Sequence, residues 1–407
     1  MRPRLRPGLG AVLAAVLVAF GTGSAVASSS SRPLSQRLAR ALAVPHVPAS
    51  RSAAVAFDLA TGTAVFAKNS SLSLVPASNE KLTVTYAALE ALGADHRIAT
   101  DVLGDGVLDG TTWNGPLILQ GHGDPTLSSV DLNWLARQVR AAGIRKVLGP
   151  VVGDESYFDA RRTGPGWKQS FFINESPALS ALTVDRTWFH GYHSRVPALA
   201  AASLFRDALR AHGVVVTGRA VVGKASPEAS PLGEVQSPPL GQILRFMDRD
   251  SDNFTAELLL KQVAAVNGVV GTSAAGAAEV RGLLATAHVP LAGVRIVDGS
   301  GLSPYDRLTA RAIVAILRAA WDDREIKSAF VSALAVAGRS GTLKDRLRRP
   351  PARGAVQAKT GTTSLASALS GYVRRRYVFS VLQNGHPVSY WWARRAQDRF
   401  VTVLAGG

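Results

Sequence analysis

Two residues of this 407-residue chain, Ser78 and Lys81, have the types and the spacing that nucleophilic catalysis needs. They lie three residues apart, so on a helix both side chains project from one face. A serine hydroxyl attacks a carbonyl group only after a neighbouring base takes its proton, and a desolvated lysine amine can be that base. The pair alone is a weak signal, because roughly one serine–lysine pair at this spacing is expected by chance.

A second triplet, Ser251, Asp252 and Asn253, lies just before an amphipathic stretch. The hydroxyl of Ser251 can pass a proton to a leaving amine. The amide of Asn253 can hold either Lys81 or the backbone of a substrate. Asp252, between them, is a candidate for substrate binding.

A third segment, Lys359, Thr360, Gly361 and Thr362, closes a run of strand-forming residues. The lysine and the two threonines offer a cation and hydroxyl groups for a substrate carboxylate, and Gly361 leaves room beside the strand. Together the three segments predict a site for a substrate whose reacting carbonyl lies near a carboxylate.

In this order the three segments resemble the signature of the active-site serine penicillin-recognising enzymes. Further segments resemble the class C low-molecular-mass penicillin-binding proteins, which are D-alanyl-D-alanine carboxypeptidases/endopeptidases of bacterial cell-wall metabolism. These segments are residues 76–82, 119–127, 153–159, 298–303, 337–343 and 357–362.

The resemblance implies an enzyme that cleaves the D-Ala-D-Ala end of a peptidoglycan stem peptide and that binds β-lactams covalently. Ser78 would be the nucleophile, and Lys81 its base or part of its proton relay. The backbone N–H groups of Ser78 and Thr362 would form the oxyanion hole. We expect no organic cofactor and no metal ion.

Two alternatives stay open at this point, a β-lactamase on the same scaffold and a non-catalytic penicillin-binding or wall-binding protein. Segments 119–127 and 153–159 are not expected in a plain β-lactamase and favour the peptidase. Asp154, in the second of these segments, either contacts the stem peptide, as its family position suggests, or only caps a turn.

The N-terminus resembles a secretory signal. Three arginines lie in residues 2–6, an apolar stretch runs from Leu9 to Phe20, and Ala25-Val26-Ala27 gives a small-x-small cleavage pattern. We therefore expect cleavage near Ala27 and a mature protein outside the cytoplasm, in the periplasm or cell wall.

The composition excludes several other classes of protein. The chain has no cysteine, so disulfide frameworks, thiolate metal sites and cysteine nucleophiles are ruled out. Its formal charge of +17 invites a nucleic-acid partner, but the arginines are scattered and no long basic run occurs. We expect no nucleic-acid binding, and an anionic envelope explains the positive charge better.

Strand-forming runs near both ends of the chain predict one sheet assembled from the two termini. The runs are residues 53–57, 63–66, 355–359, 368–373 and 377–382, with helices from Ser78 and at 243–247, 254–266, 274–286, 309–320 and 389–404. The predicted fold class is α/β (α+β), a β-lactamase/transpeptidase-like antiparallel sheet between helices with an inserted β-rich domain. The predicted boundaries are a signal peptide at 1–27, a catalytic domain at 28–95 and 240–407, and an insert at 96–239.

Two features depart from the resemblance. After Arg186 the chain passes almost directly to a helix near Ala198, so a second insert that the family often carries is predicted to be reduced or missing. The residue three before Ser251 is Asp248, at a position where asparagine is common.

Overall fold

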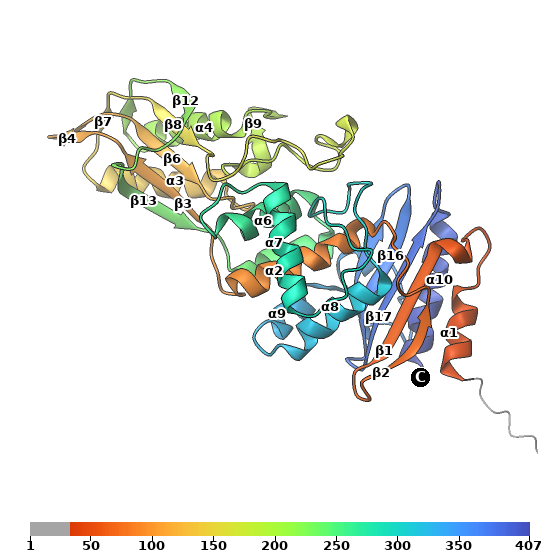
Figure 1. The fold of residues 1–407 in the computed structure, drawn as a ribbon. Helices are drawn as coiled ribbons and strands as arrows, with labels where there is room; N and C mark the ends of the chain where they lie inside the picture. Colours follow the sequence, from red (N-terminus) through yellow and green to blue (C-terminus); the bar gives the residue numbers. More distant parts are fainter. Residues whose placement is uncertain (1–32) are drawn as a thin grey trace, which may run out of the picture. The chain divides into compact units, whose positions relative to one another are not determined.

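The computed structural model describes residues 33–407, in which Leu34–Gly407 form one compact unit (Figure 1). The predicted signal peptide, residues 1–27, lies outside the described residues and stays a prediction. Within the described part of the chain, no helix combines the length and the apolar character that crossing a membrane requires.

The core of the fold is a six-stranded sheet with strands from both ends of the chain. The strand order is β14-β15-β16-β17-β1-β2, and every neighbouring pair is antiparallel. The strands are β1 (Ser52–Asp58), β2 (Thr63–Lys68), β14 (Ala335–Val336), β15 (Val356–Thr362), β16 (Ala366–Val373) and β17 (Tyr377–Asn384). The predicted sheet is present, and only the two-residue β14 was not expected.

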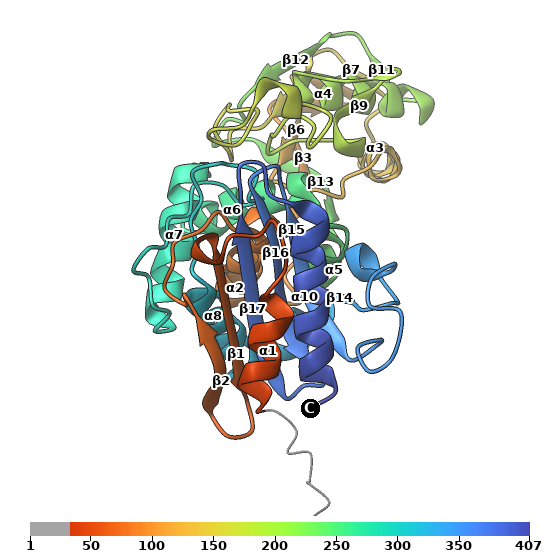
Figure 2. The same cartoon turned by 90° about the vertical axis from the view of Figure 1, so that its right-hand side faces the viewer.

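One face of this sheet is covered by the first and last helices of the described chain, α1 (Leu34–Leu42) and α10 (Tyr390–Ala405) (Figure 2). Successive residues of a strand point to opposite faces, and β1 follows this rule. Ala54 and Ala56 pack with the α1 and α10 side chains, whereas Ala53 and Val55 belong to the core on the other face.

The other face carries the helices that hold the predicted catalytic residues. They are α2 (Lys81–Leu92), α5 (Leu240–Asp250), α6 (Asn253–Ala265), α7 (Ser273–Thr286), α8 (Ala310–Asp322) and α9 (Lys327–Ala333). Every residue of α2 from Lys81 to Leu89 is buried, as is every residue of α6 from Phe254 to Ala265. Helices buried on all sides belong to the interior of a domain, so the catalytic side chains project from the most rigid part of the fold.

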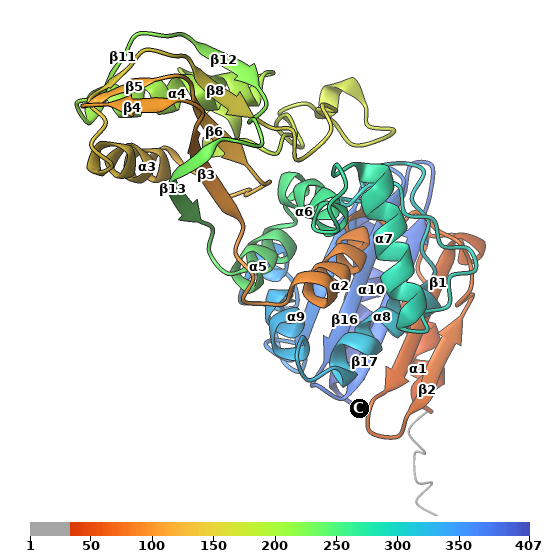
Figure 3. The same ribbon diagram turned by 60° about the vertical axis from the view of Figure 1, so that its left-hand side comes forward.

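The segment between α2 and α5 forms a separate set of strands and two helices (Figure 3). A five-stranded sheet has the order β12-β8-β6-β3-β13, and a four-stranded sheet has the order β11-β7-β5-β4. Their bounds are β3 (Ala99–Gly104), β4 (Val107–Asp109), β5 (Thr112–Asn114), β6 (Leu117–Gly121), β7 (Lys146–Val147), β8 (Val151–Asp154), β11 (Val215–Val216), β12 (Ala220–Gly223) and β13 (Ser230–Gln236), and the helices are α3 (Ser129–Ala141) and α4 (Pro197–Ala211). A short hairpin, β9 (Trp188–Phe189) and β10 (Tyr192–His193), precedes α4.

These strands have their own apolar core, in which Leu119, Leu135 and Phe205 are buried together. The first strand of the set begins at Ala99 and the last ends at Gln236. The division of the chain into domains at 95/96 and 239/240 stays a prediction.

Candidate active site

The three predicted segments meet at the ends of buried elements. Ser78 lies in a short 3₁₀ turn that leads directly into α2, whose first residue is Lys81. Ser251 follows the last residue of α5, and Asn253 begins α6. Lys359 lies in the middle of β15, the strand second from the edge of the sheet. Side chains from three helix ends and one strand therefore reach one place.

The backbone is strained where two of these hydroxyl groups are presented. Ala77, just before Ser78, has φ 48°, and Ser251 has φ 62°. Left-handed backbone costs a non-glycine residue roughly 1–2 kcal/mol. Such strain is typical of sites where the surrounding fold holds a functional group in place.

Lys81 makes three polar contacts although its side chain is fully buried. Its Nζ donates to the carbonyl oxygen of Ser300 at 2.7 Å and to Oδ1 of Asn253 at 2.8 Å, and lies 3.3 Å from Oγ of Ser78. A lysine ammonium has three donors, whereas a neutral amine has two N–H groups and one lone pair. The neutral amine can keep the two short contacts and turn its lone pair to Ser78. This geometry suits proton transfer from Ser78 to Lys81.

Lys359 holds the second hydroxyl of the site. Its Nζ donates to Oγ of Ser251 at 2.8 Å and to the carbonyl oxygen of Thr360 at 3.0 Å. The hydroxyl of Thr360 is 2.8 Å from that of Thr342, which sequence reasoning did not single out. The predicted cation and hydroxyl groups therefore lie together on β15.

Gly361 brings β15 against the backbone of the nucleophile. A Cβ atom at this position would lie 2.9 Å from the carbonyl oxygen of Pro76 and 3.1 Å from the nitrogen of Ser78. A larger residue would push the strand away from Ser78. Thr362, the next residue, is exposed at the end of the strand. The close approach is compatible with an oxyanion hole formed by the N–H groups of Ser78 and Thr362.

Burial controls the charge of the two lysines. It lowers the pKa of Lys81 to about 8, although nearby acids led by Asp298 oppose the shift. Burial, and then the positive charge of Lys81, lower the pKa of Lys359 to about 7. Because the two lysines interact, the two pKa values belong to the pair, and at a pH between them about one of the two amines is charged.

Buried acids hold the loop that carries the carbonyl group of Ser300, to which Lys81 donates. Glu257 Oε1 accepts from the N–H groups of Gly299 and Ser300, both at 2.9 Å. Asp298 accepts from Trp167 Nε1 at 2.7 Å, which connects this loop to the segment between β8 and α4. Burial raises the pKa of Glu257 to about 8, so this acid is neutral at pH 7. Ser300 contributes through its backbone, which no residue pattern reveals.

The carboxylate of Asp252 is bound by protein groups. Its carboxylate caps α6 by accepting from the N–H of Thr255 at 2.8 Å, and it pairs with both terminal nitrogens of Arg186 at 2.7 and 3.2 Å. Arg186 also lies over the ring of Phe254. In this structure the carboxylate holds the turn between Ser251 and Asn253, and its predicted role in substrate binding stays a prediction.

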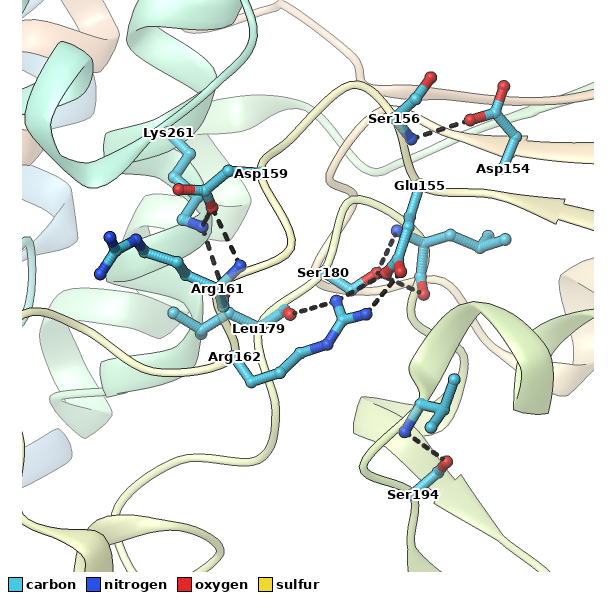
Figure 4. A network of polar contacts seen from close by, with 12 residues as sticks. Asp154, Glu155, Ser156, Asp159, Arg161, Arg162, Leu179, Ser180, Ser194 and Lys261 are labelled. Carbon is cyan, nitrogen blue, oxygen red and sulfur yellow. Dashed lines mark hydrogen bonds and ion pairs between the residues drawn. The ribbon is translucent and has the colours of Figure 1, made fainter. Parts of the chain in front are cut away.

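Asp154 is also engaged elsewhere (Figure 4). It is fully buried at the end of β8 and accepts from the N–H groups of Ser156 and Ala225 and from the amide of Gln120, at 2.8 to 2.9 Å. Burial raises the pKa of this carboxyl, but the hydrogen bonds outweigh burial and lower the pKa below its usual value. Protein donors satisfy its carboxylate, which favours the alternative in which Asp154 closes a turn, and its contact with the stem peptide stays a prediction.

The neighbouring residues in Figure 4 connect the segment after β8 to α6. The fully buried amine of Lys261, on α6, pairs with Asp159, and Arg162 pairs with Glu155. A buried amine without its partner is strongly unfavourable, so these contacts hold the segment over the site.

This segment also contributes to a cavity beside Thr362. The cavity has a volume of about 300 Å³. Its lining residues are Val75, Gly166, Lys168, Phe171, Glu175, Gly301, Leu302, Ser303, Pro304, Thr362, Thr363, Ser364 and Leu365. Glu175 also accepts from the amide of Asn253 through its carbonyl oxygen at 3.2 Å and its carboxylate at 3.3 Å. Sequence reasoning missed Lys168 and Glu175, because they lie far in sequence from all three catalytic segments.

A serine nucleophile, a buried lysine base and a strand lysine on an antiparallel sheet define a penicillin-recognising serine hydrolase. The chain belongs to the D-Ala-D-Ala carboxypeptidase 3 (S13) family, whose sequence model matches residues 34–191 and 188–405. The match confirms the predicted enzyme, a serine-type D-Ala-D-Ala carboxypeptidase. Within the described residues, no group of three or more acids and histidines is arranged to hold a metal ion.

Two curated relatives are similar along most of the chain. A D-alanyl-D-alanine carboxypeptidase of Actinomadura sp. (strain R39) is 31% identical over 482 aligned positions, which include 95% of this chain and 89% of the relative. A carboxypeptidase of Mycobacterium tuberculosis is 33% identical over 376 positions, with 85% and 78% covered.

A solved structure confirms the predicted fold. The crystal structure of penicillin-binding protein 4 from Haemophilus influenzae has a TM-score of 0.79 and 22% identity, and the match covers 91% of this chain and 98% of that protein. The same protein has also been solved in complex with a β-lactam.

The family match divides close to the position where the sequence predicts a reduced or missing second insert, which stays a prediction. The two matched segments meet at residues 188–191, just after Arg186. The alignment with the Actinomadura enzyme is longer than this chain, so that relative carries segments that are absent here. At this position the described chain has the short β9–β10 hairpin.

Proposed function

We propose that this chain is a secreted enzyme that removes the terminal D-alanine of peptidoglycan stem peptides through an acyl-enzyme on Ser78. The observation that carries the proposal is the contact of the buried Lys81 amine with Ser78, Asn253 and Ser300. The names of the relatives support a D-Ala-D-Ala substrate, and the signal pattern in residues 1–27 supports export.

Acylation begins when Ser78 Oγ attacks the carbonyl carbon of the penultimate D-alanine and passes its proton to the neutral amine of Lys81. The N–H groups of Ser78 and Thr362 stabilise the negative charge that develops on the carbonyl oxygen. As the peptide bond breaks, Ser251 gives its proton to the leaving amine. The proton that Lys81 took from Ser78 replaces it, so Ser251 is a hydroxyl and Lys81 is neutral again. Lys359 orients the Ser251 hydroxyl and binds the free carboxylate of the substrate.

Deacylation repeats these steps with water in place of the leaving amine. Lys81, which is neutral again after acylation, takes a proton from the water. The ester bond to Ser78 breaks, and that proton passes from Lys81 to the serine oxygen. The same steps apply when the leaving amine belongs to a cross-link rather than to free D-alanine, so we propose D,D-endopeptidase activity as well. A β-lactam carries a strained amide close to a carboxylate, and we expect it to acylate Ser78 in the same way.

The test is release of D-alanine from a peptide ending in D-Ala-D-Ala, measured beside β-lactam turnover by the same purified chain. We expect D-alanine release over many turnovers and a penicilloyl adduct that persists for minutes or longer. Rapid β-lactam hydrolysis without D-alanine release would instead identify a β-lactamase. A stable adduct without D-alanine release would identify a non-catalytic penicillin-binding protein.

The two lysine pKa values predict a bell-shaped pH dependence for D-alanine release. Below about pH 7 both lysines are protonated and Ser78 lacks a base, so kcat/KM falls as pH falls. Above about pH 8 both are neutral and the substrate carboxylate loses its cation, so kcat/KM falls as pH rises. A bound carboxylate favours the charged form of Lys359, which leaves Lys81 as the neutral member.

A pH series of kcat/KM under constant ionic strength checks this expectation. The optimum should lie near pH 7 to 8. A rate that rises steadily to pH 10, as two ordinary lysines would give, would contradict the assigned charges.

A further inference from the structure

A buried carboxylate joins the two helices that carry the catalytic segments. Asp248 lies on α5, three residues before Ser251, and is fully buried. Its Oδ2 accepts from the hydroxyl of Thr85 at 2.7 Å, and Thr85 lies one helical turn after Lys81 on α2. The other oxygen, Oδ1, has no hydrogen-bond partner among the described residues. Burying an ionised carboxylate with one oxygen unbonded costs free energy, and a nearby cation reduces that cost.

The cations that act on Asp248 are the two lysines of the site. Burial raises the pKa of Asp248 to about 6, and Lys359 and then Lys81 work against this shift, so the group is ionised at pH 7. Asp248 acts on both lysines: it is the leading acid for Lys359, whereas Asp298, Asp252 and Glu257 act more strongly than Asp248 on Lys81. Its charge therefore acts on the lysines as a pair.

The other acids near Lys81 are less suited to this task. Glu257 is neutral at pH 7, and Asp252 is paired with Arg186. Both oxygens of Asp298 are bound by donors of its own loop and by Trp167.

The surroundings of α5 bring few other charges. The other charged residues of α5 are Arg245, Arg249 and Asp250, and Lys359 lies on β15. The helices packed against α5 bring Lys81 and Glu90 on α2, Glu257 and Lys261 on α6, and Lys327 on α9, whereas β14 and residues 341–343 bring none.

We propose that Asp248 is a positioning residue of the reaction, a buried counter-charge shared by Lys81 and Lys359 that keeps one proton on the pair when Ser78 attacks. This inference rests on the proposed function. Two buried ammonium groups repel each other, and a nearby negative charge favours their charged forms. Without it the pair loses its protons at lower pH, and Lys359 loses the charge that binds the substrate carboxylate.

The test is Asp248→Asn, which removes the charge but keeps the size of the side chain and an oxygen that can accept from Thr85. Removing a negative charge lowers the pKa of a nearby lysine. Both limbs of the pH profile of kcat/KM should therefore move to lower pH by about one unit. The rate of penicillin acylation should shift in the same direction. Below pH 6, where the wild-type carboxyl is itself protonated, the two profiles should converge.

The matched control is Asp250→Asn, which removes the same charge from an exposed position on the same helix. Water screens this position, so its shift should be clearly smaller. A second variant, Thr85→Val, keeps the carboxyl but removes the hydrogen bond that favours its charged form. Its acid limb should also move to lower pH, and it serves as the test if Asp248→Asn does not fold.

Two results would overturn the inference. One is a uniform loss of rate with both limbs unmoved, which a purely structural residue would give. The other is an equal shift in Asp250→Asn. A wild-type chain that neither releases D-alanine nor reacts with penicillin would instead contradict the proposed function, so the two failures are distinguishable.

Discussion

Ser78→Ala is expected to abolish both D-alanine release and covalent labelling by a fluorescent penicillin. The substitution removes the atom that forms the acyl bond, and loss of a catalytic nucleophile typically costs about 10⁴-fold or more in rate. Ser78 is only partly buried and makes one side-chain contact, with Lys81, so the fold should tolerate the change. Gel fluorescence and a D-alanine assay on the same preparation measure both effects.

The matched control is Ser71→Ala, an exposed serine of the same segment. It should label and turn over like the wild-type chain. Labelling that survives Ser78→Ala would assign the nucleophile to another residue and remove the basis of the mechanism.

Lys81→Met is expected to slow acylation by roughly 10²- to 10⁴-fold, the range that general-base catalysis contributes. Methionine fills most of the space of the buried lysine stem but offers no amine, so Ser78 keeps its position and loses its proton acceptor. Stopped-flow acylation by a chromogenic β-lactam measures the loss. Circular dichroism and the melting temperature show whether the variant is folded.

An exposed lysine, Lys344, provides the control, because Lys344→Met removes one amine without touching the site. Near-normal acylation in folded Lys81→Met would exclude this lysine as the base, even if Ser78 were still required. The two substitutions therefore test separate parts of the mechanism.

The catalytic residues could be predicted from the sequence because their chemistry depends on residue type and on local spacing. Ser78 and Lys81 are three residues apart, which places them one turn apart on a helix. Lys359 to Thr362 are consecutive residues at the end of a strand-forming run, so they were expected on one strand. The antiparallel sheet followed from strand-forming runs at both ends of the chain, although the short β14 and helix α1 were not predicted. These elements are too short to show the alternation or the helical periodicity from which a strand or a helix is predicted.

The residues that sequence reasoning missed act through tertiary contacts. Ser300 contributes a backbone carbonyl group, and any residue at that place in the loop has one. Glu175 reaches Asn253 only because the segment after β8 folds back over the site. Asp154 was a candidate for substrate contact because of its family position, and Asp252 because it lies between Ser251 and Asn253. In the structure, local donors satisfy the first carboxylate and Arg186 pairs with the second. Such competition for a carboxylate is visible only when the fold is known.

The most direct test of the account is to find which residue a β-lactam acylates. The wild-type chain is reacted with penicillin, quenched in acid, digested with trypsin and analysed by tandem mass spectrometry. We predict the penicilloyl group on the peptide Asn69–Lys81, with fragment ions that place it on Ser78 and not on Ser70, Ser71 or Ser73. An unmodified peptide, or an adduct on any other residue, would contradict the assignment of Ser78 as the nucleophile.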